Sequence, residues 1–464
     1  MPVAKNQKLA VIGSFAKIPR YQGAGSSKIN PHHITSLCDA LDARHISYTW
    51  AAGYEAENAE ADETLIAQAV KVSEEADVII ACVGLPDSYE SEGFDRAHLE
   101  MPEAQNVLID ALIATGKPVV ALVSTGAVIH MPWQDKVDSI LLLYLAGQNG
   151  GTAAAQLLLG EAVPCGKLAE TWPKSLNDCP CGDNFGHGGN VEYRESIYVG
   201  YRYYDKAQKE VAYPFGFGLS YTSFQYSDLK LSKEVCTDSD IVNVTCNITN
   251  TGAYAGAEVV QLYVVPPESS AFKPVRELRD YQKVFLHTGE SKTLTFQLNR
   301  RAFAYYNVNI SDWFVESGEY RIELGSSSRD IRLFATLTIH SAQNGEIPDY
   351  RNTAKEYYDL TGGSQFSKES FASLIETPIT PWRSVRPFTR NSTLGELRTC
   401  PMGETVVNQV IQGMQAALGG SGDLAVMLMA MVEDMPLRQL GMMAGDQFSN
   451  EKVEELLTML NAQS

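Results

Sequence analysis

The sequence VIIACVGLPDSYESEGFDR, from Val78 to Arg96, places a run of apolar residues directly before an acidic loop. Residues 78–84 are apolar at both odd and even positions, which predicts a strand buried on both faces, as in a parallel sheet. The loop that follows holds four carboxylates, two aromatic residues and one arginine within ten residues. Because ligands of open α/β sheets bind beyond the carboxyl ends of the strands, this loop is the first candidate for chemistry.

Other apolar runs of the same kind surround this stretch, with helical patterns between them. The runs cover residues 9–13, 119–123 and 140–145. Asn30 before Pro31 is typical of a helix start, since the missing proline N–H costs nothing in the first turn. Pro102 begins a second clear helical pattern. The alternation predicts an α/β layered domain over residues 1–222, with helices on both faces of the sheet.

The pattern changes near residue 223. Up to about residue 340, short runs of alternating apolar and polar residues are separated by turn signals such as Asn250-Thr251-Gly252. Such spacing predicts an all-β fibronectin type III-like (immunoglobulin-like) sandwich over residues 223–340. Residues 341–464 are expected to form a linker and a helical C-terminal region, in which Ser449 caps the last helix.

Charge and hydropathy exclude several classes of partner. The chain carries 37 Lys and Arg against 56 Asp and Glu, a net charge of −19, which disfavours nucleic acid and anionic membranes. Its longest strongly apolar stretch, residues 424–432, is too short for a bilayer span of about 20 residues. The first residues lack a signal-peptide pattern, so a soluble cytoplasmic protein is expected.

The eight cysteines are too sparse for a disulfide framework, and reduced thiols are expected. Cys179-Pro-Cys181, with His187 nearby, departs from the spacing of zinc sites and is interpreted as a loop. Neither a metal nor another cofactor is predicted.

A second loop of interest, YQGAGSS (Tyr21–Ser27), follows the first strand. Its glycines and serines before a helix can cradle an anion or hydrogen-bond sugar hydroxyls. It lacks the full dinucleotide-binding glycine spacing, and no phosphate-binding loop supports a nucleotide-binding protein. In the acidic loop, a carboxyl beside aromatic surface is desolvated, which raises its pKa and suits it to donate a proton. The alternative is that these acidic residues are merely solvated.

Taken in order, six motifs of the first half resemble the second domain of glycoside hydrolase family 3, the β-glucosidase family. They are YQGAGSS (21–27), ESEGFDR (90–96), GQNGG (147–151), GKLAETWP (166–173), YRESIYVGYRYYD (193–205) and YPFGFGLSYTSF (213–224). AGAEVVQLYV (255–264) and RAFAYY (301–306) resemble the fibronectin type III-like domain of that family. The resemblance runs from about residue 8 to 340.

The resemblance implies a retaining glycosidase, with a carboxylate nucleophile and a carboxylic acid/base about 5 Å apart. The family carries its acid/base at the Glu before Gly-aromatic, which here is Glu92, with Glu90 as the competitor. Gly25, Ser26 and Phe94 match positions that contact the sugar.

The same comparison gives Asp95 and Arg96 a supporting role. They are interpreted as a pair that fixes the acidic loop rather than as chemical groups.

The nucleophile of the family is an aspartate on an N-terminal TIM-like barrel, and this sequence contains no such barrel. The implied function is therefore a portion of a β-glucosidase-type hydrolase acting on a β-glucoside or small oligosaccharide. A separate barrel chain or a homo-oligomer is the expected partner. The alternative function is a non-catalytic carbohydrate-binding or scaffold protein derived from a truncated glycosidase.

Overall fold

The structure, a computed structural model, describes residues 2–180, 182, 191–363, 366–379, 385–418, 431–444 and 449–462. Its contacts form two compact units, Val3–Ala155 with Trp382–Ser464, and Gln156–Pro381 with Met1–Pro2. No helix of the described ranges is long and apolar enough to span a membrane.

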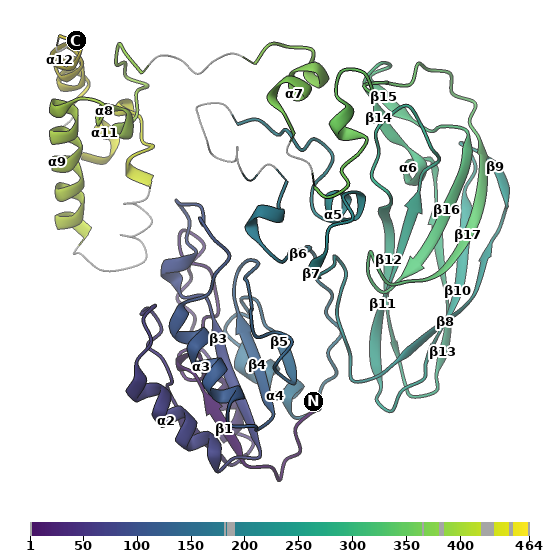
Figure 1. The fold of residues 1–464 in the computed structure, drawn as a ribbon, viewed down its shortest axis with the longest axis horizontal. Helices are drawn as coiled ribbons and strands as arrows, with labels where there is room; N and C mark the ends of the chain where they lie inside the picture. The colour runs from purple at the N-terminus through teal and green to yellow at the C-terminus, as the bar shows by residue number, and fades with distance from the viewer. Residues whose placement is uncertain are drawn as a thin grey trace. The chain divides into compact units, whose positions relative to one another are not determined.

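A five-stranded parallel sheet forms the centre of the N-terminal region (Figure 1). Its strands are β1 (Leu9–Ile12), β2 (Tyr48–Ala51), β3 (Val78–Gly84), β4 (Val119–Ser124) and β5 (Ser139–Leu142), in the order β2-β1-β3-β4-β5. Every residue of β1, β3 and β4 is buried, which confirms three of the apolar runs as buried strands. The run at residues 140–145 begins within β5, whose residues are only partly buried, so the expected burial on both faces was wrong there. The sequence analysis missed β2, a short edge strand whose residues are mostly half-exposed.

Four helices connect or follow these strands. They are α1 (Leu37–Asp42), α2 (Glu63–Glu74), α3 (Glu103–Ile113) and α4 (Gly150–Leu158). The helix expected at Pro31 was wrong: α1 begins only after Ser36, whose hydroxyl accepts the Asp39 N–H while the Asp39 carboxylate accepts the Ser36 N–H. This reciprocal cap gives hydrogen-bond partners to two backbone N–H groups at the helix start. Among the described residues, Asn30 and Pro31 cap no helix. The helix after Pro102 is confirmed as α3.

The strand order places the helices on both faces of the sheet. The chain moves outward from β1 to β2, then crosses back over β1 to β3 and continues to β4. Because crossovers between parallel strands are right-handed, α1 lies on the face opposite to α2 and α3, and α2 packs against α3. The predicted α/β layered fold is confirmed.

Two antiparallel sheets then pack face to face as a sandwich (Figure 1). One has the order β13 (Ser291–Leu298), β10 (Val242–Asn250), β8 (Phe224–Leu231). The other has the order β12 (Glu277–Leu286), β11 (Gly256–Val265), β16 (Gly318–Gly325), β17 (Ile331–His340), β9 (Val235–Thr237), with β9 parallel to β17. Alternating side chains such as Val244, Phe296 and Leu324 form its dry core, which confirms the predicted fibronectin type III-like fold.

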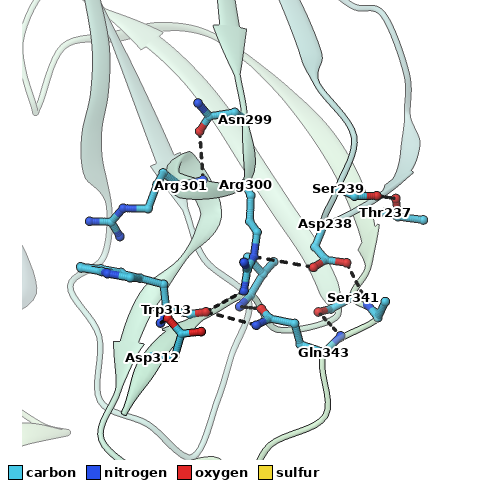
Figure 2. A network of polar contacts seen from close by, with 12 residues as sticks. Thr237, Asp238, Ser239, Asn299, Arg300, Arg301, Asp312, Trp313, Ser341 and Gln343 are labelled. Atoms are coloured by element: carbon cyan, nitrogen blue, oxygen red, sulfur yellow. Dashed lines mark hydrogen bonds and ion pairs between the residues drawn. The ribbon is translucent and has the colours of Figure 1, made fainter. Parts of the chain in front are cut away.

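A polar network closes one end of this sandwich beside α6 (Arg300–Phe303) and the hairpin of β14 (Tyr305–Asn307) and β15 (Asp312–Phe314) (Figure 2). The Arg300 guanidinium donates to the Trp313 carbonyl at 2.9 Å and lies 3.8 Å from the Asp238 carboxylate. Asp238 also accepts the Ala342 N–H at 2.8 Å, and Gln343 donates to the Trp313 carbonyl. The network therefore fixes the chain where it leaves β17.

The segment that precedes the sandwich in sequence packs onto it. Lys167 Nζ lies 3.1 Å from the Glu258 carboxylate, and the Gln261 amide donates to the Gly216 carbonyl at 3.1 Å. These contacts explain why residues from Gln156 onward group with the sandwich, so the contact units differ from the predicted division at residues 222 and 340. The segment includes α5 (Tyr201–Lys206) and the small sheet of β6 (Trp172–Pro173) and β7 (Val211–Tyr213).

An aromatic cluster extends this packing to residues beyond 340. The Tyr198 hydroxyl donates to the Tyr357 carbonyl at 2.6 Å, and the Tyr357 hydroxyl donates to the Arg194 carbonyl at 2.6 Å. Phe366 stacks on both tyrosine rings. The first part of the expected linker, up to α7 (Lys368–Ile375), is thus packed structure.

The C-terminal helices that the structure describes share an apolar core of their own. They are α8 (Leu394–Leu397), α9 (Pro401–Leu418), α11 (Leu437–Ala444) and α12 (Asn450–Asn461). The Ser449 hydroxyl accepts the Lys452 N–H, so the predicted cap of the last helix is confirmed.

The sandwich core yields a stability prediction. Phe296 on β13 is fully buried, and Phe285 on β12, in the other sheet of the same domain, is 58% exposed. Phe296→Ala should lower the free energy of unfolding by about 3–5 kcal/mol, because it removes buried contacts and leaves a cavity. Urea denaturation measures the loss, with Phe285→Ala as the matched control. Equal losses for the two variants would contradict the assignment of the core.

Candidate active site

The strand order of the parallel sheet reverses between β1 and β3. From β1 the chain leaves toward β2, whereas from β3 it leaves toward β4 on the other side. The chain thus leaves these two strands in opposite directions, and such a switch point is where open α/β sheets bind ligands. The glycine-rich loop, residues 21–27, follows β1, and the acidic loop, residues 85–96, follows β3.

The two loops are joined by backbone and side-chain contacts around Glu92. Ala24 and Ser91 form an isolated parallel bridge, and the Glu92 N–H donates to the Ala24 carbonyl at 3.3 Å. Ser26 N–H donates to Glu92 Oε2 at 2.7 Å. The structure thus brings together Ser26 and Glu92, which the sequence singled out from loops 66 residues apart.

Gly25 is required at this junction. Its φ is +118°, and a Cβ there would lie 2.6 Å from the Glu92 Cβ and 2.8 Å from Oε2. Only glycine combines that backbone conformation with so close an approach. Gly25 therefore sets the contact between the loops, while its predicted role in contacting a sugar stays a prediction.

The electrostatics of Glu92 differ from the expectation. Hydrogen bonds from the Ser26 hydroxyl and the Ser26 amide lower the pKa of the exposed Glu92 carboxyl. The sequence analysis instead expected aromatic neighbours to desolvate an acid in this loop and raise its pKa. The Glu92 side chain is exposed, so neighbouring aromatic residues do not shield its carboxylate from water. Glu92 is therefore ionised at neutral pH in this arrangement.

Glu90, the competing acid/base, has structural partners. Its side chain is 13% exposed, and Oε1 accepts the Gly126 N–H at 2.5 Å. The same oxygen lies 3.3 Å from Nη2 of Arg20. Sequence reasoning missed Arg20, although one signal was present: a lone arginine directly before the glycine-rich loop.

The proposed pairing of Asp95 with Arg96 was wrong. Arg96 Nη1 donates to the Val128 carbonyl at 2.8 Å, and the described residues show no ion pair between Arg96 and Asp95. Burial lowers the pKa of the Arg96 guanidinium, and the charge of Glu90 opposes this shift. Arg96 thus fixes the end of the acidic loop through the backbone following β4.

The described residues contain no group of three His, Cys, Asp or Glu side chains arranged to hold a metal ion. Of the Cys-Pro-Cys segment, Cys179 is described and accepts a hydrogen bond from the Tyr204 hydroxyl at 3.4 Å. Cys181 and His187 lie outside the described residues.

Comparison with known proteins identifies the domain that contains these loops. Residues 1–221 match the glycosyl hydrolase family 3 C-terminal domain, and residues 258–328 match the fibronectin type III-like domain. The chain belongs to glycosyl hydrolase family 3. The matched domain includes the switch point and both loops, so the candidate site lies within the family 3 portion.

Relatives in family 3 are glycosidases. The chain is 40% identical to thermostable beta-glucosidase B of Acetivibrio thermocellus over 465 residues, which is 99% of this chain and 57% of that protein. It is 38% identical to an exo-alpha-(1->6)-L-arabinopyranosidase of Bifidobacterium breve, over 96% of this chain and 53% of that protein. The chain therefore spans slightly more than half the length of these relatives.

Solved family 3 structures share the fold. The crystal structure of a Bifidobacterium adolescentis beta-glucosidase matches with a TM-score of 0.71 at 40% identity, over 88% of this chain and 54% of that one. Beta-glucosidase 3B of Thermotoga neapolitana in complex with glucose matches with a TM-score of 0.66 at 30% identity. The match covers 75% of this chain and 52% of that one.

The contact between Ser26 and Glu92 predicts a pH effect. Ser26→Ala should raise the pKa of Glu92 toward its ordinary value, because the hydroxyl hydrogen bond to the charged form is lost. A ¹³C NMR titration of the Glu92 carboxyl carbon measures the change, with Ser27→Ala as the control. An unchanged titration in Ser26→Ala would contradict the contact.

The sign of the linked stability effect follows. A carboxyl whose pKa is lowered on folding stabilises the fold above its unfolded pKa, and this contribution is lost as the pH falls through the folded pKa. Ser26→Ala should therefore be less stable than wild type at neutral pH, and the difference should shrink in acid.

Proposed function

We propose that this chain is the portion of a β-glucosidase-type hydrolase that supplies the acid/base, Glu92, for retaining cleavage of O-glycosyl bonds. The observation that carries the proposal is the contact between Glu92 and Ser26 at the switch point of a family 3 domain. The names of the relatives, beta-glucosidases and arabinopyranosidases, support glycoside hydrolysis as the reaction class.

In the first step of the proposed reaction, Glu92 donates a proton to the glycosidic oxygen while a carboxylate attacks the anomeric carbon. In the second step, Glu92 removes a proton from the water that releases the sugar. The nucleophile is expected on a barrel domain, which the 464 residues do not contain. A barrel domain that lies outside these 464 residues and completes the site is the proposed partner.

Glu92 must gain a proton before the first step. The Ser26 hydrogen bonds favour the ionised form, so the bound sugar has to replace or weaken them. Sugar hydroxyls are suited to this exchange, because they donate to and accept from the same loop groups.

The proposed substrate is a β-glucoside or a small oligosaccharide. Similar chains were solved with glucose and, for a Listeria innocua beta-glucosidase at 26% identity, with laminaribiose. Ser26, Gly25 and Phe94 are the proposed contacts to the sugar.

A second candidate function is carbohydrate binding without hydrolysis. The lowered pKa of Glu92 favours it, because a carboxylate ionised at neutral pH accepts hydrogen bonds from a sugar but donates no proton. Turnover experiments separate the two functions.

A chain of these 464 residues alone should show no measurable hydrolysis of aryl β-glucosides. Proton donation by a positioned acid supplies about 10²–10⁴-fold, too little for a glycosidic bond without a nucleophile. The release of nitrophenol from the aryl glucoside measures this. Robust turnover that Glu92→Gln abolishes would reveal a nucleophile within the chain.

Adding a barrel domain from a family 3 relative should restore β-glucosidase activity. In this assembly, Glu92→Ala should cut kcat/KM for alkyl glucosides by about 10²–10⁴-fold and leave that for dinitrophenyl glucoside nearly unchanged. Azide needs no base, so it should rescue turnover of the activated substrate and yield a glycosyl azide of retained configuration.

Glu90→Gln is the matched control in the same assembly. It alters a carboxylate held by Arg20 and Gly126, so azide should not rescue any loss that it causes. Azide rescue in Glu90→Gln but not in Glu92→Ala would move the acid/base to Glu90. Binding of glucose by the completed assembly without turnover would instead favour the non-catalytic function.

A further inference from the structure

Arg20 lies buried between the two loops of the candidate site. Its side chain is 5% exposed, and its guanidinium has partners on three sides. Nε lies 2.6 Å from Asp87 Oδ1, Nη1 donates to the Leu85 carbonyl at 2.6 Å, and Nη2 lies 3.3 Å from Glu90 Oε1. Nε also donates to the Gln22 carbonyl at 3.1 Å, within the glycine-rich loop.

These contacts connect three loops at the carboxyl edge of the sheet. Arg20 is on the chain after β1, Asp87 and Glu90 are on the loop after β3, and Gly126, which donates to Glu90, follows β4. Glu92 is only two residues beyond Glu90. The position of its carboxylate against Ser26 therefore depends on where the Arg20 contacts hold the loop.

Charge explains why a cation is needed there. The acidic loop carries four carboxylates in ten residues, which repel one another when the loop is compact. Lys28 Nζ lies 3.5 Å from Asp87 but is 42% exposed, so its charge is more strongly screened. Arg20 is the buried charge that two of these carboxylates share. Its planar fork can bond several acceptors at once, which a lysine ammonium cannot reproduce.

We propose that Arg20 is a positioning residue for the acid/base, holding the Glu92 loop against the glycine-rich loop through Asp87, Glu90 and the Leu85 carbonyl. This inference rests on the proposed function for its catalytic consequence. Its structural part can be tested in this chain without any substrate.

The first test is amide hydrogen exchange in Arg20→Lys, measured by NMR. The Ser26 and Glu92 N–H groups report the contact between the loops, because one donates to Glu92 and the other to Ala24. Both should exchange at least about tenfold faster in the variant, while amides of β1 and β3 keep their rates. Unchanged exchange at Ser26 and Glu92 would overturn the proposal.

The second test uses the assembly completed with a barrel domain. A misplaced acid slows cleavage of poor leaving groups most, so Arg20→Lys should lose about tenfold more kcat/KM on an alkyl glucoside than on dinitrophenyl glucoside. Leu112→Ala, which removes a fully buried side chain of α3, is the control for lost stability. It should lower both values equally.

The outcomes separate this proposal from the proposed function. Equal losses on the two substrates in Arg20→Lys, when Glu92→Ala discriminates between them, would overturn the positioning role. If the wild-type assembly is inactive, the proposed function fails, and the exchange rates alone decide whether Arg20 holds the loops. Should Arg20→Lys not fold, Asp87→Asn weakens the same ion pair from its more exposed side and should show the same pattern in both tests.

Discussion

The reversal of strand order between β1 and β3 is the constraint on which the candidate site depends. Two neighbouring parallel strands send their chains to opposite sides, and the loops at their carboxyl ends meet at the edge where open α/β sheets bind ligands. In this chain one of those loops is rich in glycine and serine, and the other is acidic. Every contact of Glu92 described above follows from this arrangement.

Two glutamates two residues apart have opposite environments. Glu90 is largely buried and contacts Arg20 and Gly126, whereas the exposed Glu92 carboxylate accepts hydrogen bonds from Ser26 across the loop junction. A buried carboxylate with fixed partners maintains the shape of a loop, because breaking its ion pair is costly. An exposed carboxylate whose hydrogen bonds come from one neighbouring residue can exchange them for hydrogen bonds to a substrate.

The packing of the remaining chain shows that domain boundaries in sequence and compact units in space differ. The family 3 domain runs to residue 221, yet residues from Gln156 onward group by contact with the β-sandwich. Two contacts explain this grouping, because each joins segments that composition assigns to separate parts. They are the ion pair of Lys167 with Glu258 and the hydrogen bond from Tyr198 to Tyr357. Buried polar groups need these partners, so the segments fold as one body.

The sequence by itself determined the two fold classes and the identity of the two loops. Apolar runs such as residues 78–84 predict buried strands because hydrophobic burial acts on local patterns. Pro102 marks a helix start because its missing N–H costs nothing there, and Ser449 does so by accepting the Lys452 N–H. The start of α1 is also encoded locally, by Ser36 and Asp39, although it was not predicted. Tertiary structure alone decided the edge strand β2, the partners of Arg20 and the lowered pKa of Glu92. These features depend on distances between residues far apart in sequence, such as the 66 residues between Ser26 and Glu92, which no local pattern encodes.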